Sequence, residues 1–246
     1  MDTTNRTSTT CNGMKAVIMA GGEGVRLRPF TYVIPKPLLP VGEVTVLEHT
    51  IRELARNGIA NVFISTNYHA RQFQQCVPYG EKYGVKLCLF KESQKLGTAG
   101  ALYLIKDSLD DPFCVLNGDL IFKVDIAGMF RMHREKNADI TIGIKKHNLT
   151  IPYAIIERGQ NGDLLDISEK PTYTYFINAG IYVLSPSVLA SLSTEAYLDM
   201  PTLIDLTRGS GGKVLVYDIG DRWLDMGQIS DYERAIDLIE QWNDNE

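Results

Sequence analysis

The chain has few cysteines and no long apolar run, and both shortages exclude classes of protein. Its 4 cysteines, Cys11, Cys76, Cys88 and Cys114, form no C-x-x-C pair and have no histidine pattern beside them. Structural zinc is therefore not expected, and small buried thiols in a reducing compartment are the simpler interpretation. No apolar run approaches the roughly 18 residues that a membrane-spanning helix needs, so no membrane partner is expected.

A basic bias is also missing. The sequence has 25 Lys+Arg against 30 Asp+Glu, a formal net charge of -5. Proteins that bind nucleic acid usually carry a clear excess of positive charge, so a nucleic-acid partner is not expected either. Residues 1–13 are polar and lack the apolar core of a signal peptide. We expect them to form a disordered leader, and we expect the protein to be cytoplasmic.

What the sequence does contain is a regular alternation of strand-like and helix-like segments in a chain that is 44% hydrophobic. Short apolar runs predict strands at 15–20, 61–66, 85–90, 112–119 and 139–145, and helical spacing predicts helices at 45–57, 69–79, 98–109 and 126–136. Strands that alternate with helices indicate βαβ units. The sequence therefore predicts a Rossmann-like α/β fold, with a mixed, mostly parallel sheet flanked by helices.

The pattern changes in the second half of the chain. Segments 153–158 and 163–171 flank a turn at Gly159–Gly162, which predicts a β-hairpin. Further strands are predicted at 176–184 and 213–219, and further helices at 186–192, 200–208 and 230–242. Because no repeat, low-complexity stretch or linker separates the two halves, we predict a single domain over 14–246 with an elaborated C-terminal half.

A glycine-rich loop follows the first predicted strand. The sequence there is GGEGVRLRP, from Gly21 to Pro29. Glycines let a backbone curl closely around a ligand and point its N–H groups inward, which suits a chain of phosphates. Arg26 and Arg28 add positive charge to the loop, and Lys36 follows between two prolines that hold its segment extended. The loop is therefore a candidate polyphosphate site.

Other interpretations of the loop are weaker. A dinucleotide-binding fingerprint would need a third glycine where Leu27 stands, and the Walker A pattern is absent. The structural alternative is a simple glycine turn at the end of a strand, with solvated arginines. The extended pattern GG-x-G-x-RL-x-P followed by PKP-LLP-V is much more specific than a lone glycine cluster, and it favours phosphate binding.

The segment MAGGEGVRLRPFTYVIPKPLLPVG resembles the signature of the sugar nucleotidylyltransferase family. Further motifs follow in the family's order: E-x-x-x-LGTAGAL at 92–102, NGD at 117–119, PYAIIE at 152–157, EKP at 169–171, NAGIYVL at 178–184, DMPTLI at 199–204 and WLDMG at 223–227. The residues within these motifs are most similar to those of the mannose-1-phosphate and glucosamine-phosphate guanylyltransferase branch. The resemblance covers about residues 14–242. It implies the nucleotidyltransferase A-type fold, with a nucleotide-binding part over about 14–120 and a sugar-binding part over about 121–246.

The resemblance also implies a reaction. A phosphate oxygen of a sugar 1-phosphate would attack the α-phosphorus of a nucleoside triphosphate, and pyrophosphate would leave. Two polyanions must meet in such a step, so charge neutralisation and alignment should dominate catalysis. No protein nucleophile is needed. Consistent with this, the 4 histidines lie in no nucleophile–base motif and are expected to be ordinary core or surface residues.

The resemblance assigns roles to named residues. It implies that Arg26 holds the departing β- and γ-phosphates, Lys36 the α-phosphate and Lys170 the phosphate of the sugar. It implies Mg²⁺ as the cofactor, held by Asp119 and Asp225, because this ion is often bound by one or two carboxylates plus substrate phosphates. The matching nucleotide-binding positions are Ala20, Gly21, Gly22, Gly24, Glu92, Gly97 and Thr98, and the sugar-binding positions are Asn117, Tyr153, Ala154, Glu169 and Asn178.

Each assignment has a structural alternative. Asp119 and Asp225 could be turn or cap residues, and Glu169 and Lys170 could be a solvated surface pair. Ala154 departs from the family, which usually has glycine there, and its methyl group could narrow the sugar pocket. The sugar itself is not readable from the sequence.

Glu92 stands where the family reads the edge of the base. An ionised carboxylate only accepts hydrogen bonds, and guanine offers the adjacent donors N1–H and N2–H₂, so GTP is favoured, with UTP as the next candidate. The alternative is that Glu92 simply faces solvent. Relatives are often dimers or tetramers, which leaves a homodimer open.

Two other functions remain open at this point. One is the same chemistry on a non-sugar phosphorylated acceptor, and the other is a regulatory relative that binds nucleotide sugars without turnover. Such regulatory relatives tend to lose the arginine, the lysine or a metal-binding aspartate. This chain keeps Arg26, Lys36, Asp119, Lys170 and Asp225, so the sequence favours an enzyme whose partners are a nucleoside triphosphate and a sugar 1-phosphate.

Overall fold

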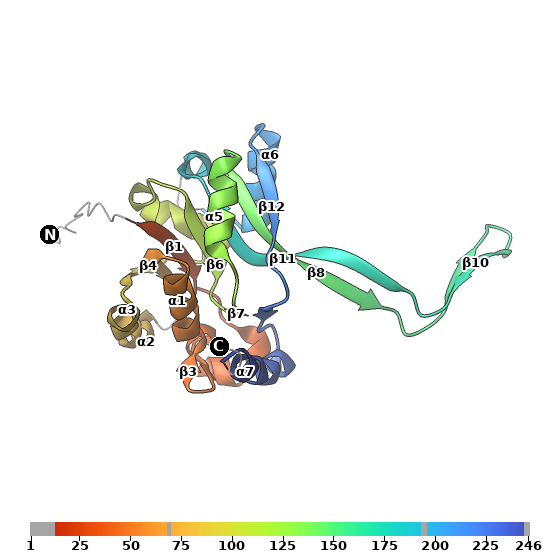
Figure 1. Ribbon diagram of the computed structural model, residues 1–246, viewed down its shortest axis with the longest axis horizontal. Coiled ribbons are helices and arrows are strands. Elements are labelled where there is room, and N and C mark those ends of the chain that lie inside the picture. The colour runs from red at the N-terminus through yellow and green to blue at the C-terminus, as the bar shows by residue number, and fades with distance from the viewer. Residues whose placement is uncertain (1–12, 68–69, 193–195, 244–246) are drawn as a thin grey trace.

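The structure is a computed structural model that describes residues 13–67, 70–192 and 196–243 (Figure 1). A 7-stranded sheet forms its centre, in the order β12-β8-β11-β6-β1-β4-β5. The strands are β1 (Met14–Met19), β4 (Ile59–Thr66), β5 (Lys86–Lys91), β6 (Phe113–Asn117), β8 (Ile140–Thr150), β11 (Thr172–Leu184) and β12 (Val214–Asp218). Only β11 pairs antiparallel with its neighbours in this sheet. The predicted mixed, mostly parallel α/β sheet is confirmed.

Helices cover both faces of the sheet. One apolar cluster joins the sheet to α1 (Val46–Arg56), α3 (Val77–Tyr83) and α5 (Ile126–Glu135), and a second joins it to α4 (Gly97–Gly100) and α6 (Met200–Gly209). Along β1, Ala16 and Ile18 enter the first cluster while Val17 enters the second. This alternation follows from the two-residue period of a strand, and it explains why the run is apolar throughout. Within the described ranges, no helix is long and apolar enough to cross a membrane.

A smaller layer lies beside the end of the sheet. There β7 (Leu120–Phe122) pairs antiparallel with β13 (Trp223–Asp225), and β2 (Pro40–Val41) pairs with β3 (Val44–Thr45). The last helix, α7 (Ile229–Asn243), packs against this layer through Ala235, Ile239 and Trp242. The β7–β13 pairing brings the far C-terminal part of the chain next to the end of β6.

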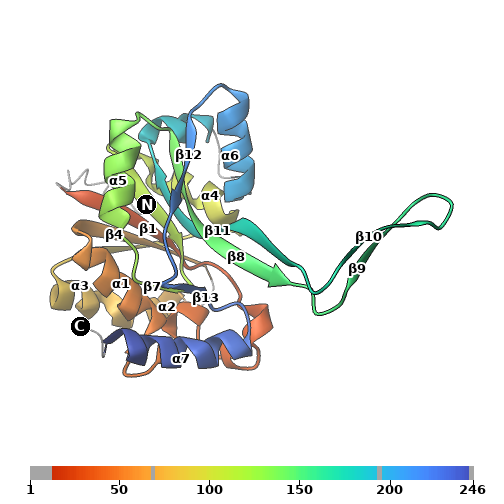
Figure 2. The same cartoon turned by 45° about the vertical axis from the view of Figure 1, so that its right-hand side comes forward.

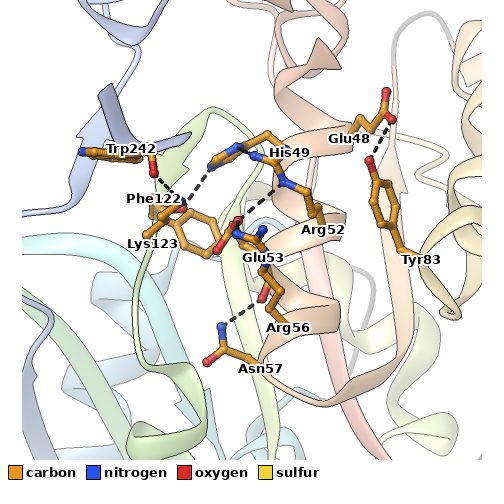
Figure 3. Close-up of polar contacts among 10 residues, drawn as sticks. All are labelled: Glu48, His49, Arg52, Glu53, Arg56, Asn57, Tyr83, Phe122, Lys123 and Trp242. Atoms are coloured by element: carbon orange, nitrogen blue, oxygen red, sulfur yellow. Dashed lines mark hydrogen bonds and ion pairs between the residues drawn. The ribbon is translucent and has the colours of Figure 1, made fainter. Parts of the chain in front are cut away.

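Buried polar contacts fix α1 and α7 to this layer (Figure 3). His49 on α1 accepts from Arg52 at Nδ1 and donates from Nε2 to the backbone oxygen of Phe122, which makes it a neutral imidazole. Burial lowers the pKa of His49 to about 4, in keeping with the neutral form. Lys123 donates to the carbonyl of Trp242 near the end of α7. Like His49, His133 is buried, as expected of core histidines, whereas His69 lies outside the described residues.

Several predicted helices differ in detail. The predicted helix at 69–79 is broken into α2 (Ala70–Phe73), a 3-10 turn over Gln74–Cys76 and α3, and Pro78 stands in the first turn of α3, where it has no N–H to continue the preceding turn. The predicted helix at 98–109 is one α-helical turn, α4, followed by a 3-10 helix over Ala101–Ser108. The helix predicted at 186–192 is also a 3-10 helix, Pro186–Ser191. Position 13 aside, the leader predicted at 1–13 lies outside the described residues.

The predicted hairpin is confirmed as β9 (Ile155–Arg158) paired antiparallel with β10 (Leu164–Ser168). Its surroundings were not predicted, because β8 and β11 run beyond the sheet and continue pairing from Lys145 opposite Ile177 to Thr150 opposite Thr172. Figures 1 and 2 both show this two-stranded extension leaving the body of the protein. We call residues 145–177 the arm. Its outer residues are exposed on both faces, so these strands have no buried face of the kind that the strands of the central sheet have.

A bulge marks the root of the arm. Between two paired positions, β11 takes four residue steps, from Asn178 to Tyr182, while β8 takes only two, from Ile144 to Ile142. Gly180 lies within the extra length with φ of 68°, a left-handed conformation that glycine adopts without strain. A Cβ at this position would stand 2.6 Å from the side-chain nitrogen of Asn117, so the bulge packs directly against the end of β6.

Candidate active site

A cavity of about 360 Å³ opens at the carboxyl ends of β1 and β6. In open α/β sheets this edge is where ligands bind. The cavity lining brings together 11 of the residues predicted from the sequence: Ala20, Gly21, Gly22, Gly24, Arg26, Lys36, Glu92, Gly97, Thr98, Asn117 and Asp119. Segments that are far apart in the chain therefore meet at one cavity.

Close packing constrains Gly21 in the loop and Gly118 after β6. A Cβ on Gly21 would lie 2.6 Å from a carboxylate oxygen of Glu92, and one on Gly118 would lie 2.9 Å from the backbone oxygen of Met19. Gly24 has φ of 60° and begins the short 3-10 turn that carries Arg26, while the hydroxyl of Thr31 donates to its carbonyl. The loop thus keeps its backbone next to the cavity. By contrast, a Cβ on Gly22 would meet nothing within 4 Å.

Lys36 and Asp119, which line the cavity, form a charged cluster with Asp225, which is not among the lining residues. The Nζ of Lys36 donates to Oδ2 of Asp119 at 2.5 Å and lies 4.0 Å from Oδ1 of Asp225. Lys36 is only 8% exposed, which is unusual for a lysine without a carboxylate partner. Asp119 follows β6 directly, and Asp225 is positioned opposite Leu120 by the β7–β13 pairing. The carboxylates of the two predicted aspartates therefore both lie within 4.0 Å of one ammonium group.

Asp225 is held in an unfavourable setting for a carboxylate. Burial raises its pKa above the usual value for aspartate, and the charge of Asp119 adds to this effect, while Lys36 and Arg26 oppose it. Its Oδ1 atom is buried and has no hydrogen-bond partner among the described residues, although the side chain as a whole is 46% exposed. Unpaired buried oxygens are uncommon and call for a ligand or a functional role. The turn-residue alternative does not explain this atom.

Glu92 does not face solvent, so that alternative is wrong. Its side chain is only 4% exposed, because its oxygens accept hydrogen bonds from the hydroxyl of Ser65 and from the backbone N–H of Leu96. These bonds fix the start of the Gly97–Thr98 segment at the cavity wall. A carboxylate has about four acceptor positions, so further bonds to a ligand remain open to it. Reading of the base by Glu92 stays a prediction.

The Gly97–Thr98 segment also anchors the DMPTLI motif. Thr98 accepts from the backbone N–H of Met200, and a Cβ on Gly97 would lie 2.5 Å from the carbonyl of Leu198. Asp199 in turn caps α6 by accepting from the N–H of Thr202. Part of this motif is therefore structural, because it seats α6 against the wall of the cavity.

Residues not predicted from the sequence also line the cavity: Met19, Val25, Leu27, Pro37, Lys95, Gly118, Tyr197 and Gly227. Most of them lie inside the family-like motifs, next to predicted residues, so membership of a motif was the signal that could have found them. Tyr197 stands just before DMPTLI and had no such signal. Arg26 lies close to Gly227 at the cavity, because a Cβ on Gly227 would lie 3.7 Å from the guanidinium of Arg26.

Five residues predicted for the sugar side do not line the cavity: the sugar-binding residues Tyr153, Ala154, Glu169 and Asn178, and Lys170, predicted to hold the phosphate of the sugar. Tyr153, Ala154, Glu169 and Lys170 belong to the arm, are exposed and do not line the cavity. Asn178, at the root of the arm, accepts from the N–H of Gly180 within the bulge that packs on Asn117. The sugar side of the predicted site is therefore divided between the body and the arm.

Comparisons with known proteins identify the family of the chain. A family model described as nucleotidyl transferase matches residues 15–241. A mannose-1-phosphate guanyltransferase of Yarrowia lipolytica is 34% identical over 89% of this chain and 62% of its own length. A UTP–glucose-1-phosphate uridylyltransferase of Synechocystis is 30% identical over 91% of this chain and 62% of its own. This chain thus spans about 62% of the length of these curated relatives.

Solved structures show the same architecture. A putative glucose-1-phosphate thymidylyltransferase from Bacillus anthracis superposes with a TM-score of 0.73 at 26% identity, covering 92% of this chain and 94% of its own. HddC from Yersinia pseudotuberculosis superposes with a TM-score of 0.71 at 22% identity, covering 92% and 99%, and bears on the fold alone. Because the family model covers most of the chain and the motif residues meet at one cavity, this chain belongs to the nucleotidyl transferase family.

Proposed function

We propose that the chain transfers a nucleotidyl group from a nucleoside triphosphate to a sugar 1-phosphate and releases pyrophosphate. The observation that carries the proposal is that the glycine-rich loop, Lys36 and Asp119 line a single cavity, with Asp225 beside Lys36. The names of the curated relatives support the reaction class, since they include a mannose-1-phosphate guanyltransferase and a UTP–glucose-1-phosphate uridylyltransferase.

The residues present suit the charge problem of this reaction. A sugar-phosphate oxygen forms a new bond to the α-phosphorus while the bond to the bridging oxygen of the β-phosphate breaks, and pyrophosphate leaves with the electron pair. The attacking oxygen is already ionised, so no proton has to be removed. Lys36 neutralises charge at the α-phosphate, Arg26 holds the departing phosphates, and the loop keeps the reactants in line.

Mg²⁺ fits the two aspartates. The buried, unpartnered Oδ1 of Asp225 and the neighbouring carboxylate of Asp119 are oxygen donors of the kind this ion prefers. In the described part of the chain no group of three or more His, Cys, Asp or Glu could hold a metal, so substrate phosphates and water would complete the shell. Bound there, the ion would supply positive charge to the phosphates.

GTP is the proposed nucleotide. The motifs are most similar to the guanylyltransferase branch, and Glu92 offers acceptor oxygens at the cavity wall. UTP is the second candidate, because the Synechocystis relative is named for it and uracil also presents a donor to a carboxylate.

Glu92→Gln is expected to lower the ratio of kcat/KM for GTP over UTP by about tenfold, which is the size of one hydrogen bond to a charged group. Glutamine has an NH₂ donor in place of one of the two acceptor oxygens of Glu92. In the wild type, the backbone N–H of Leu96 already donates to Oε2 of Glu92. The measurement is steady-state kinetics with both nucleotides. Ser65→Ala is the matched control, because it removes the neighbouring hydroxyl and leaves the carboxylate in place. Unchanged selectivity in Glu92→Gln would remove this residue from base recognition.

The primary test is pyrophosphate release with Mg²⁺, using five nucleoside triphosphates against a panel of sugar 1-phosphates, with Asp119→Ala as the blank. We expect release that needs both substrates and vanishes in the blank. Silence from a folded protein that still binds nucleotide would favour the regulatory alternative. Release only with a phospho-polyol or another non-sugar phosphate would favour the other-acceptor alternative.

A further inference from the structure

The strand that carries Asp225 has little backbone pairing to hold it in place. In the described part of the chain, β13 pairs only with β7, over three residues. Just before this pairing, the backbone N–H of Lys123 donates to the carbonyl of Arg222. Because backbone groups along a strand point alternately to its two edges, the carbonyl of Trp223 points away from β7. This free edge of β13 needs a further contact to fix the position of Asp225.

Lys145, the first residue of the arm, occupies this free edge. Its ammonium group donates to the carbonyl oxygens of Asp221 and Trp223, each at 3.1 Å. It also lies 5.5 Å from the centroid of the Trp223 ring, which places a cation against an aromatic face. Lys145 itself is fixed by the pairing of β8 with β11, where it lies opposite Ile177. One side chain therefore joins the root of the arm to the strand of Asp225.

A second contact holds the same strand from the side of the bulge. The indole N–H of Trp223 donates to the carbonyl of Ala179 at 2.8 Å, and Ala179 lies in the extra length of β11 at the root of the arm. Side chains two residues apart on a strand share a face, so those of Trp223 and Asp225 lie on the same face of β13. A shift of this strand would change the distance from Asp225 to Lys36, which is 4.0 Å. The geometry of the charged cluster therefore depends on how β13 is held.

We propose that Lys145 is a positioning residue, which holds β13 so that Asp225 and Asp119 can bind one divalent cation together. The inference rests on the proposed function, because it concerns the metal side of the same site. Lys145 is not among the residues that line the cavity, so it acts through the backbone of β13 and not by contact with a substrate. Loss of a contact that orients a metal ligand typically lowers metal affinity or activity by about 10- to 100-fold.

Lys145→Met tests the proposal, because it keeps the length of the side chain and removes its hydrogen-bond donors. The probe is Mn²⁺ alone, titrated into nucleotide-free protein and followed by the EPR signal of the free ion. We expect the dissociation constant to rise about tenfold. Loss of a positive charge by itself would strengthen the binding of a cation, so the direction of the change separates positioning from simple electrostatics. Unchanged or tighter binding would overturn the proposal.

Lys213→Met is the matched control. Lys213 also donates to a backbone carbonyl, that of Lys136, but it precedes β12 at the edge of the sheet opposite the cavity. Its Mn²⁺ binding should equal that of the wild type. Lys145→Arg should recover most of the lost affinity, because a guanidinium has donors for both carbonyls of β13. If the arginine variant binds Mn²⁺ as weakly as Lys145→Met, hydrogen bonding to β13 is not the cause and the proposal is wrong.

Trp223→Phe is an independent variant for the case that Lys145→Met does not fold, which thermal unfolding in chelator would show. It removes the N–H that is bonded to Ala179 and leaves both backbone carbonyls to Lys145. Weaker Mn²⁺ binding is again expected, because the same strand is released on its other side. Unchanged binding would mean that the hold on β13 does not set the metal site.

Two further measurements separate this inference from the proposed function. Asp225→Asn should lower the affinity for Mn²⁺, and a wild type whose Mn²⁺ binding does not depend on Asp225 would overturn the positioning role. In an active enzyme, the Mg²⁺ concentration that gives half-maximal pyrophosphate release should rise about tenfold in Lys145→Met, with kcat largely restored at saturating Mg²⁺. A wild type that binds Mn²⁺ through Asp225 but releases no pyrophosphate with any substrate pair would count against the proposed function alone.

Discussion

Lys36→Met is expected to lower the rate of pyrophosphate release by about a thousandfold, the scale on which a preorganised charge at a reacting centre acts. The ammonium group is buried, donates to Asp119 and lies 4.0 Å from Asp225, so it is held at the meeting point of the loop and both aspartates. Methionine keeps a similar volume and removes the charge. Asp119 remains partly solvated, with 30% of its side chain exposed, so the fold should survive the loss of its partner.

The measurement is kcat at saturating substrates, with thermal unfolding to check the fold. Lys36→Arg is the matched variant, because it keeps the positive charge but replaces the compact ammonium by a planar guanidinium. Its kcat should lie between those of Lys36→Met and the wild type. A Lys36→Met enzyme with near wild-type kcat would remove Lys36 from the transition state.

Asp225→Asn is expected to separate activity from stability. Turnover should fall by about a hundredfold or more, because one of the two carboxylates that would hold Mg²⁺ becomes a neutral amide. The folded protein without metal should become more stable at neutral pH. The pKa of Asp225 is raised in the folded state, chiefly by burial, so the ionised carboxylate is disfavoured by folding.

The sign of this effect gives a pH dependence. A raised carboxyl pKa means that the folded state favours the protonated acid, so wild-type stability from this group is lost as pH rises through the folded pKa. Asparagine does not titrate, and the gain in melting temperature of Asp225→Asn over wild type should therefore be present near about pH 8 and absent near about pH 4. The measurement is thermal unfolding in chelator at both values. A variant that is less stable than wild type at about pH 8 would show that attraction to Lys36 outweighs burial.

The nucleotide side of the site could be predicted from the sequence because its parts are local. The loop at Gly21–Pro29 and the motif at 117–119 each follow a strand whose apolar run is easy to recognise, and parallel strands place their ends at one edge. The partnership of Asp225 with Asp119 rested on resemblance alone, because the β7–β13 pairing that joins them involves three residues on each side. Such short pairs leave no periodic pattern.

The hairpin at the tip of the arm could be predicted, but the outer parts of β8 and β11 could not. Strands are predicted from an apolar run buried on both faces or from one buried face, and the segment from Lys146 to Thr150 is exposed throughout. The burial of the Glu92 side chain could not be predicted either, because it depends on a hydrogen bond from Ser65, which lies on the neighbouring strand β4. In both cases the deciding contacts lie across strands, whereas the motifs report only neighbours along the chain.

The bulge at the root of the arm has a consequence for insertions and deletions. Side chains on a strand alternate between faces, so a change of one residue in the stretch from Asn178 to Tyr182 would turn every outer residue of β11 to the opposite face. A change of two residues would restore the original facing. At the far end, the turn at Gly159–Gly162 is exposed, and extra residues there would leave the facing of both strands intact. Whether an odd or an even number of residues is added or removed between Asn178 and Tyr182 therefore decides which face of the arm each outer side chain of β11 occupies.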